Sequence, residues 1–468
     1  MKRVVKFLAV FLFLIFTFII INRCASTRTS VDFYTPVHTN LINENYSLAL
    51  KTIEEAKQQG EYVEKDRVLY YLDKGITLYY MGKADESIAT LEKAEQAMEE
   101  LFTKSISKAA ASFILNDNAL DYFGEIYENL YVNIFKSLNY IKLNKFDDAY
   151  VEVKRVNDKL RELDVKYGEM AKGMNDNENA KGKIKYESSH FYNDALADYL
   201  SYLIFRADGE EDNSRISFDK MKQAFKTQPQ IYDYPFPEQI KYKKPLRRDD
   251  MRSFLNIIAF TGQAPYKYEV GGKITTYDDF IAITDLGMPL NIPNIYWPGI
   301  KSGYHFKFSF PALRTPPSRV DRILVFINGE KAGKMPLLEN MGKIAEATFK
   351  SNQNLIILKT ILRTVSKGLI AAEAKKQLRK ETKSDVFAGF LMDMAIDLAV
   401  DATENADLRC WRTMPQFCYA SEYELPKGES YRIEIHFVDR NNQLISRKVM
   451  DNLELGTKLN LVDAVSLN

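Results

Sequence analysis

Histidine and cysteine are scarce in this chain of 468 residues, which contains four histidines and three cysteines. The histidines are scattered and show no H-E-x-x-H spacing for a zinc ion. There is no phosphate-binding G-x-x-x-x-G-K-[ST] loop, no G-x-S-x-G nucleophile elbow and no Rossmann glycine pattern. A glycan-cleaving enzyme needs two carboxylates across a cleft, and no such pair stands out among the many acidic residues. The sequence therefore predicts no metal, no cofactor and no catalytic residues.

An excess of charge of either sign is also absent. Lysine and arginine number 64 and aspartate and glutamate 63, so the net charge is +1. Nucleic-acid-binding domains are typically basic, and this balance therefore gives no case for a nucleic-acid partner. With 46% hydrophobic and 27% charged residues, the chain can bury a sizeable core. Its length predicts two or three domains.

A long apolar run lies at the N-terminus. Residues 1–6 are basic, residues 7–21 are apolar, and Asn22-Arg23-Cys24 follows. A basic start and an apolar stretch of this length are typical of a secretory signal. The stretch would span roughly 22 Å as a helix, short of the about 30 Å needed to cross a bilayer comfortably. Bacterial lipoproteins are cut and lipidated at a cysteine in this position. Residues 1–24 are therefore predicted to be a signal and lipid-anchor segment, with Cys24 as the lipidation candidate.

The residue before Cys24 is unusual for lipidation, because the peptidase prefers a small side chain there and this chain has Arg23. Two alternatives remain open: an uncleaved N-terminal anchor, and a cleaved signal without lipid. All three place the body in the cell envelope, facing the periplasm or the exterior, with residues 25–38 as a linker. The first two also attach the protein to a membrane.

Residues 39–227 lack strand alternation and contain pairs of helices. Apolar residues recur at helical spacing over residues 69–80, Met81-Gly82-Lys83 breaks the helix, and a second helix follows. Two helices cross closely only where side chains are small, and here those positions are Gly75 and Ser87. This is the packing of the tetratricopeptide repeat, a helix–turn–helix unit.

The pattern recurs along this region. Small residues at the second-helix position are Ala49, Ser87, Ala149 and Ser217, which are 38, 62 and 68 residues apart. The irregular spacing indicates insertions and one long helical stretch over residues 98–134. We expect a tetratricopeptide-like solenoid.

Solenoids of this type commonly offer a concave groove to a peptide or helix of a partner. The alternative is an architectural spacer with no binding role. The groove candidates are aromatic, and each of them could instead belong to the core: Tyr79, Tyr80, Tyr122, Tyr127 and Tyr131. The predicted partners are envelope proteins, including other lipoproteins.

After a proline- and aromatic-rich connector, residues 228–262, the periodicity changes from helical to alternating. Two segments place apolar side chains on one face in this way: residues 304–310 and residues 431–437. Glycine-containing turns are expected at Asn328-Gly329 and at Gly271-Gly272. Residues 263–468 are therefore predicted to form an antiparallel sheet or a sandwich-like domain.

A helical insertion is expected at about residues 338–405, as a hairpin of two helices over residues 354–380 and 386–405. The first helix carries a basic stripe and the second an acidic one: Lys359, Arg363 and Lys367, then Asp393, Asp397 and Asp401. We expect the two stripes to pair. The alternative is a hard cation such as calcium on the three carboxylates.

Alternating polar and aromatic residues mark the segment after this insertion. In an extended chain Asp407, Arg409 and Trp411 lie on one side, so that an Asp–Arg pair would lie beside the indole. Such an arrangement would either lock the junction between helix and strand or form a ligand site.

The two cysteines of the body, Cys410 and Cys418, lie close together in the sequence. In an oxidising envelope they could form a local disulfide. The alternative is a pair of semi-buried free thiols.

The segment 406–415 and Leu425-Pro426-Lys427-Gly428 resemble the signature of a poorly characterised family of bacterial envelope lipoproteins with tetratricopeptide repeats. Its C-terminal motif, D-x-R-x-W-x-x-x-P, matches Asp407, Arg409, Trp411 and Pro415. Residues 102–107 and 127–130 are similar to the family's N-terminal half. The resemblance implies an envelope lipoprotein, working beside outer-membrane assembly or peptidoglycan-synthase-activating lipoproteins, and it implies no reaction.

We therefore expect an α+β protein: a tetratricopeptide-like solenoid followed by an antiparallel sheet or sandwich-like domain with an inserted helical hairpin. The expected function is that of an envelope-anchored scaffold or adaptor that binds protein partners through the solenoid groove, within an outer-membrane or cell-wall assembly. The alternative is a protein that binds or cleaves peptidoglycan or another glycan.

Overall fold

The computed structural model describes residues 29, 31–111, 118, 120–175, 189–247, 250–284, 294–381, 405–456 and 458–468. The predicted signal, Cys24 and the acidic stripe of the predicted helical hairpin lie outside these ranges. Within them, no helix is both long and apolar enough to cross a membrane.

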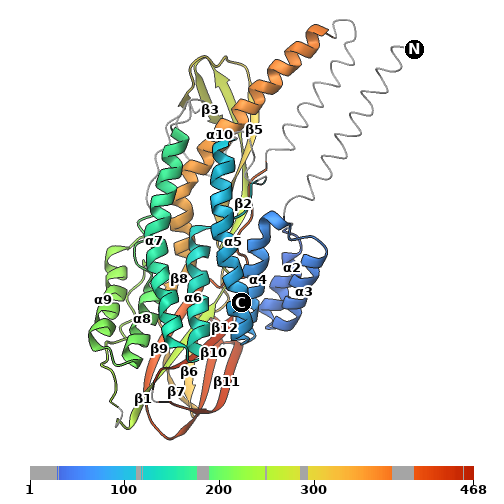
Figure 1. Cartoon of the computed structure of the whole chain (residues 1–468). Coiled ribbons are helices and arrows are strands. Elements are labelled where there is room, and N and C mark those ends of the chain that lie inside the picture. The colour runs from blue at the N-terminus through green and yellow to red at the C-terminus, as the bar shows by residue number, and fades with distance from the viewer. Residues whose placement is uncertain are drawn as a thin grey trace.

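The N-terminal half consists of helices that pair along the chain (Figure 1). The helices are α2 (Tyr34–Ile42), α3 (Tyr46–Gln58), α4 (Arg67–Tyr80), α5 (Ala84–Ala111), α6 (Ile126–Lys142), α7 (Phe146–Asn175), α8 (Ala195–Ala207) and α9 (Glu211–Thr227). The pairs α2/α3, α4/α5, α6/α7 and α8/α9 each pack as a hairpin, and each hairpin also packs on the next one. We call this layer the helical array.

These four hairpins turn in the same way. Their turn residues, Glu44, Gly82, Asn144 and Gly209, all have a positive φ, between 57° and 81°. In each case the N–H of the next residue donates to the carbonyl five positions back, at 2.8 to 3.0 Å. This is the bond that closes a helix with a left-handed residue at its C-terminal end. Because the turn is the same, the two helices of each hairpin are aligned in the same way along their length.

The residue five positions after each turn residue is small and buried: Ala49, Ser87, Ala149 and Ser214. The expectation of Ser217 for the fourth hairpin is therefore wrong by three residues. At Gly75 the helices cross so closely that an added Cβ would lie 2.6 Å from Leu91 Cδ2. Ser87 Oγ donates to the Gly75 carbonyl at 2.7 Å, which joins α4 to α5 at this crossing.

In the described residues the C-terminal half forms three four-stranded sheets. The strands are β1 (Arg252–Thr261), β2 (Tyr266–Tyr277), β3 (Phe280–Thr284), β4 (Ile295–Tyr296), β5 (His305–Arg314), β6 (Arg322–Ile327), β7 (Glu330–Lys334), β8 (Leu337–Asn340), β9 (Phe417–Pro426), β10 (Ser430–Val438), β11 (Leu444–Glu454) and β12 (Asn460–Ser466). The central sheet has the order β12-β1-β9-β8, the outer sheet β11-β10-β6-β7, and the third sheet β4-β3-β2-β5. The paired strands are antiparallel apart from β1 and β12, which run parallel.

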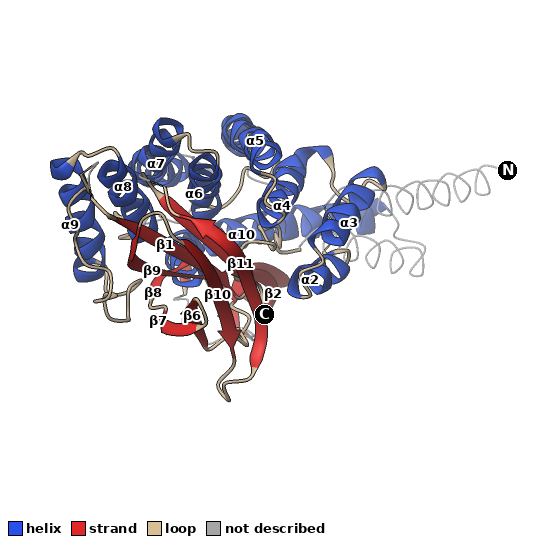
Figure 2. Cartoon of the chain, turned by 90° about the horizontal axis from the view of Figure 1, so that it is seen from below, coloured by secondary structure: helices blue, strands red, loops and turns tan. Residues whose placement is uncertain are grey.

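The central sheet lies between the helical array and the outer sheet (Figure 2). Ile258 and Phe260 of β1 belong to the core shared with the helices, while Leu255, Ile257 and Ala259 belong to the core shared with β6 and β10. Strand β1 is therefore buried on both faces. The two halves of the chain share one apolar core and are not independent bodies.

Helix α10 (Met341–Glu381) packs along the third sheet. Its Ile357, Ile361 and Val365 share a core with Ile274 of β2 and Phe308 of β5. In Figure 1 this sheet and α10 extend together, with the far ends of α5 and α7, away from the central and outer sheets.

Several sequence predictions are confirmed. Residues 305–310 of the first alternating segment lie in β5, and residues 431–437 lie in β10. Asn328-Gly329 turns β6 into β7 with φ values of 51° and 83°. The predicted turn at Gly271-Gly272 is wrong, because both glycines lie inside β2, opposite Ser309 and Phe308 of β5.

Other predicted boundaries also change. Residues 34–38 of the predicted linker form the start of α2, and residues 252–261 of the predicted connector form β1. The predicted helical stretch 98–134 is interrupted before α6, where residues 121–125 are not helical. Helix α10 begins at Met341, thirteen residues before the predicted first helix of the insertion. The second helix of that predicted hairpin falls mostly in residues outside the described ranges.

Candidate functional site

Residues 405–416, here called the junction segment, cross between the helical array and the strands. Asn118 Nδ2 donates to the carbonyl of Ala406 at 3.1 Å. At the other end, Ala264 N donates to the Met414 carbonyl at 2.8 Å. These bonds hold the segment at both ends. Between its ends it contacts the helical array through Arg409, Trp411 and Thr413.

Arg409 is the centre of a buried ion-pair network. Its Nε and Nη2 each donate to the Asp407 carboxylate at 2.8 Å, a bidentate pair. Its Nη1 donates to Asp66 Oδ1 at 2.6 Å. The other oxygen of Asp66 accepts the backbone N–H and the hydroxyl of Thr29, at 3.0 and 2.9 Å. The network therefore joins the junction segment, the start of α4 and the N-terminal segment.

Trp411 is fully buried between α6 and the sheet. Its backbone N–H donates to Glu128 Oε1 at 2.6 Å, and its indole N–H donates to the hydroxyl of Thr413 at 3.0 Å. The indole lies edge-on to Phe135, with 6.1 Å between ring centroids. The sequence predicted that an Asp–Arg pair would lie beside this indole. In the structure the guanidinium carbon of Arg409 lies 5.1 Å from the ring centroid of Tyr122.

Asp73, on α4, accepts three hydroxyl hydrogen bonds. Thr413 donates to one oxygen at 2.7 Å, and Tyr34 and Tyr62 donate to the other at 2.6 and 2.8 Å. Glu128 is held in a similar way, because its Oε2 accepts the Tyr122 hydroxyl at 2.7 Å. Each carboxylate is completely buried, and each fixes the junction segment to a different helix.

The buried carboxyl groups divide into two kinds. Burial alone would raise the pKa of Asp407, but the Arg409 guanidinium beside it holds that pKa well below its usual range. Among the described residues, neither Asp73 nor Glu128 has an ion-pair partner within 4.0 Å, and burial raises the pKa of Asp73 to about 6. Burial, helped by Glu125, raises the pKa of Glu128 to about 7. A raised pKa is typical of catalytic acids. These two carboxyls, however, are shut away from solvent and already occupied by protein donors.

These contacts fix the junction segment to the helical array, and we call this network of buried bonds the lock. Asp407, Arg409 and Trp411 each bond to a group on the same junction segment or on the helical array. Pro415 is buried at its end. Three residues of this network, Thr29, Tyr34 and Arg409, line a cavity considered below.

Four of the predicted groove tyrosines, Tyr79, Tyr122, Tyr127 and Tyr131, are buried at 4% exposure or less. Tyr80 is half-buried, and its hydroxyl donates to the Thr413 carbonyl at 2.9 Å. The prediction that these rings line an open groove is wrong, because the junction segment and the central sheet cover them.

The two cysteines are not joined. Cys410 and Cys418 are both free and fully buried, which corresponds to the alternative of two thiols, more deeply buried than expected. Burial raises the pKa of both thiols, so neither is an activated nucleophile.

A second feature lies between α5 and α7, on the other side of α6 from the sheet, and we call it the outer groove. It encloses about 360 Å³ and is lined by Glu92, Glu95, Gln96, Met98, Glu99, Phe102, Asn129, Arg155, Asp158, Lys159 and Glu162. Lys136, which is fully buried, pairs with Glu92, with Glu95 at 2.7 Å and with Glu152 at 3.1 Å. The ion pairs of Lys136 therefore hold Glu92 and Glu95 of the lining in place, and acidic side chains surround the opening.

Sequence reasoning missed Asp66, Asp73 and Glu128. Two of them could have been found from a sequence pattern: an acidic residue next to an apolar or aromatic one inside an amphipathic helix, as in Leu72-Asp73 and Tyr127-Glu128. Charged residues are rarely buried unless they are paired. Such a position therefore predicts a buried hydrogen-bonding partner elsewhere in the chain, although not which one.

Within the described ranges, no three histidine, cysteine or acidic side chains converge in a way that could hold a metal ion. No protein-family model matches this chain, and no curated protein and no solved structure matches it either.

Proposed function

We propose that this protein is an envelope-anchored, non-enzymatic scaffold, built on a tetratricopeptide-like helical array, that binds a protein partner in its outer groove. The observation that carries the proposal is that the inner face of the array already holds a peptide, the junction segment of the same chain. A scaffold of this kind needs a different surface for its partner, and the outer groove is open on the side away from the sheet.

The tetratricopeptide-like character rests on the repeated turn. Four successive hairpins share one left-handed turn residue and one small buried residue five positions later. The spacing of 38, 62 and 65 residues between the turn residues exceeds the usual 34. The added residues lengthen α5 and α7 and form the segments between hairpins. These longer helices supply the walls of the outer groove.

The chemistry of the outer groove favours a basic partner segment. Five acidic side chains against two basic ones line it, and Met98 and Phe102 add apolar surface. Glu95 is held ionised, because Lys159 and Lys136 outweigh the effect of burial and lower its pKa to about 2. Glu99 and Glu162 are exposed at the rim, where they can meet lysine or arginine side chains.

The anchor would hold this body close to the membrane. Cys24 precedes Thr29 by five residues, and Thr29 is fixed to Asp66 by two hydrogen bonds. A fully extended chain of that length reaches about 17 Å. A lipid on Cys24, as the family resemblance implies, would therefore place the start of α4 within that distance of the bilayer surface.

Charge reversal at the rim tests the partner site. The full-length protein with Glu99→Lys and Glu162→Lys should lose a membrane partner that the wild-type protein retains after cross-linking and affinity capture. Glu55→Lys together with Glu86→Lys, on the exposed surfaces of α3 and α5, is the matched control, because it reverses two charges outside the groove. Equal capture by both variants would contradict the proposed site. The mass of the mature N-terminus tests the anchor, since an intact Met1 excludes lipidation at Cys24.

A further inference from the structure

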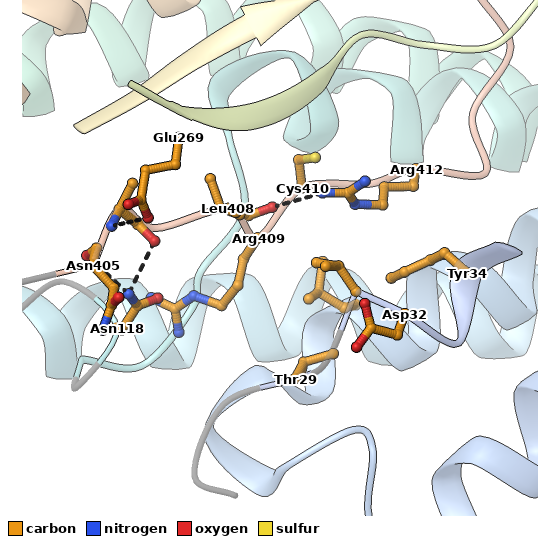
Figure 3. A pocket seen from close by; sticks show the side chains of 13 residues that line it. Thr29, Asp32, Tyr34, Asn118, Glu269, Asn405, Leu408, Arg409, Cys410 and Arg412 are labelled. Atoms are coloured by element: carbon orange, nitrogen blue, oxygen red, sulfur yellow. Dashed lines mark hydrogen bonds between the residues drawn. The ribbon is translucent and has the colours of Figure 1, made fainter. Parts of the chain in front are cut away.

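A second cavity opens beside the junction segment, on the side of the N-terminal segment (Figure 3). It encloses about 340 Å³, within the range of sites for small ligands. Its lining includes Thr29, Tyr34, Asn118, Glu269, Arg409 and Arg412. The walls at Thr29, Tyr34 and Arg409 are buried, while Asp32 and Glu269 are exposed at the rim. We call it the Arg412 cavity.

Arg412 differs from Arg409 in its ion pairing. Arg409 contacts two carboxylates. In the described part of the chain Arg412 has no carboxylate within 4.0 Å. Its Nη2 donates only to the carbonyls of Lys267 and Leu408, at 3.3 and 3.4 Å. A guanidinium carries five N–H donors. Its Nε and Nη1 have no acceptor among the described residues, so donors remain unused.

Two tyrosine rings hold this guanidinium in place. Its central carbon lies 5.5 Å from the ring centroid of Tyr34 and 5.4 Å from that of Tyr266. Such ring contacts fix the orientation of an arginine without neutralising its charge. The positive charge of Arg412 acts on two neighbouring groups that line the cavity. It lowers the pKa of Tyr34 and of Cys410, whereas burial raises both. A half-buried, oriented guanidinium with no carboxylate in contact among the described residues is suited to receive an anion.

The opposite wall supplies acceptors. Figure 3 shows Glu269, Asn405 and Asn118 across the cavity from Arg412 and Tyr34. Glu269 Oε2 accepts the Ala406 N–H at 3.2 Å, and its Oε1 has no donor among the described residues. A ligand that presents a carboxylate to Arg412 and a hydroxyl or amide N–H to Glu269 would complement both walls.

We propose that the Arg412 cavity binds a small cell-wall-type molecule through its carboxylate, with Arg412 as the anion receptor and Glu269 as the acceptor for a hydroxyl or amide. The cell-wall class rests on the envelope location in the proposed function, whereas the carboxylate requirement rests only on the cavity. Two sources present this chemistry: the lactyl group of an acidic amino sugar, and the C-terminal carboxylate of a short peptide.

Two ligand pairs distinguish these sources by isothermal titration of the full-length protein in detergent. N-acetylmuramic acid is compared with N-acetylglucosamine, which lacks the lactyl carboxylate. N-acetyl-D-alanyl-D-alanine is compared with its C-terminal amide. We expect saturable binding of one carboxylate ligand and roughly tenfold or weaker affinity for its neutral counterpart, because a charge-assisted pair is lost.

Arg412→Gln should reduce the affinity for that ligand roughly tenfold or more. Arg432→Gln, which alters an exposed arginine of β10, should leave it unchanged. Glu269→Gln, at the rim, is a second variant that should weaken binding even if Arg412→Gln does not fold. The proposal is overturned if none of the four ligands binds at millimolar concentration, if the neutral ligands bind equally well, or if the folded variants bind like the wild type. None of these results bears on partner capture by the outer groove, so the two proposals fail separately.

Discussion

Replacing Arg409 by methionine is the most direct test of the lock at the junction segment. The side chain of Arg409 is 5% exposed, and those of its partners Asp407 and Asp66 are 16% and 0% exposed. Methionine keeps much of the volume but leaves both carboxylates without their cation. Breaking a buried ion pair by removing one partner costs about 3–5 kcal/mol. We therefore expect Arg409→Met to lower the free energy of unfolding by about that amount at pH 7.

The loss should depend on pH in a defined direction. Because Arg409 holds the pKa of Asp407 well below its usual value of 3.8, the stabilisation by this group is present above pH 4. It is lost only as the pH falls through the lower pKa of the folded state. Without Arg409, burial raises the pKa of Asp407, and the variant then gains stability on acidification as its carboxyl is protonated. The difference between wild type and variant should therefore shrink between pH 7 and pH 4.

Urea unfolding followed by tryptophan fluorescence measures this, since Trp411, one of the two tryptophans, lies two residues from the substitution. Arg432→Met is the control: its side chain is 50% exposed and pairs with Glu434 and Asp451 on the surface. Exposed pairs contribute about 0–1 kcal/mol. If Arg409→Met costs no more than the control, or its cost is the same at both pH values, the network is not the lock described here.

Three further predictions follow from the same contacts. Because the pKa of Glu128 is raised to about 7, its contribution to stability is full below about pH 4.5 and is lost as the pH rises through 7. The wild type should lose on the order of 3 kcal/mol of unfolding free energy over that range, and Glu128→Gln should flatten this pH profile. Parallel profiles for the two proteins in urea titrations would contradict this. Gly75→Ala should lower the melting temperature, because overpacking against α5 costs about 1–3 kcal/mol. Gly271→Ala should change it little, because an added Cβ there would lie 3.9 Å from its nearest atom. Equal shifts in the two variants would contradict the close crossing of α4 and α5 at Gly75. Cys410 and Cys418 should resist a thiol reagent in the folded protein and react fully in urea, so that fast labelling of the native protein would show that their burial is wrong.

Local chemistry made much of this fold predictable. Gly82 ends a helix because it reaches a positive φ without strain, and Asn328-Gly329 turns a hairpin for the same reason. The alternation in β10 predicted a strand with one buried face, and its burial alternates along the chain. The Asp407–Arg409 pair was also predictable, because the two residues are two positions apart in an extended segment.

Strand β1 shows where this reasoning fails. Its sequence, R-S-F-L-N-I-I-A-F-T, places its apolar residues in the runs F-L and I-I-A-F and has no period of two. A strand buried between two layers needs apolar side chains on both faces, so the alternation that marks a strand disappears. The predicted turn at Gly271-Gly272 is wrong for a different reason: here a local pattern was present, but the structure did not follow it. Glycine permits a turn but does not require one. Both glycines pair with β5, and pairing with β3 begins at the next residue, Lys273, so the segment stays extended.

The groove tyrosines show a limit of a different kind. Helical periodicity indicates which face of α4 and α6 is buried, but it does not indicate what covers that face. The covering atoms come from β1 and from the junction segment, which lies more than 250 residues further along the chain than α6. Only the long-range contacts decide whether an apolar solenoid face receives a partner or the chain itself.

That distinction determines where function can be sought in this protein. A face closed by Arg409, Trp411 and Thr413 through bonds to α4 and α6 cannot open for a partner unless the shared core of the two halves is also disrupted. Partner binding that uses the folded protein must therefore act on surfaces that the central sheet leaves uncovered. The outer groove and the Arg412 cavity both meet that condition: residues of α5 and α7 line the first, and residues of the N-terminal segment and the junction segment line the second. If the proposed anchor and partner site are right, the buried network would hold both at a fixed separation, as the proposed tethered scaffold requires.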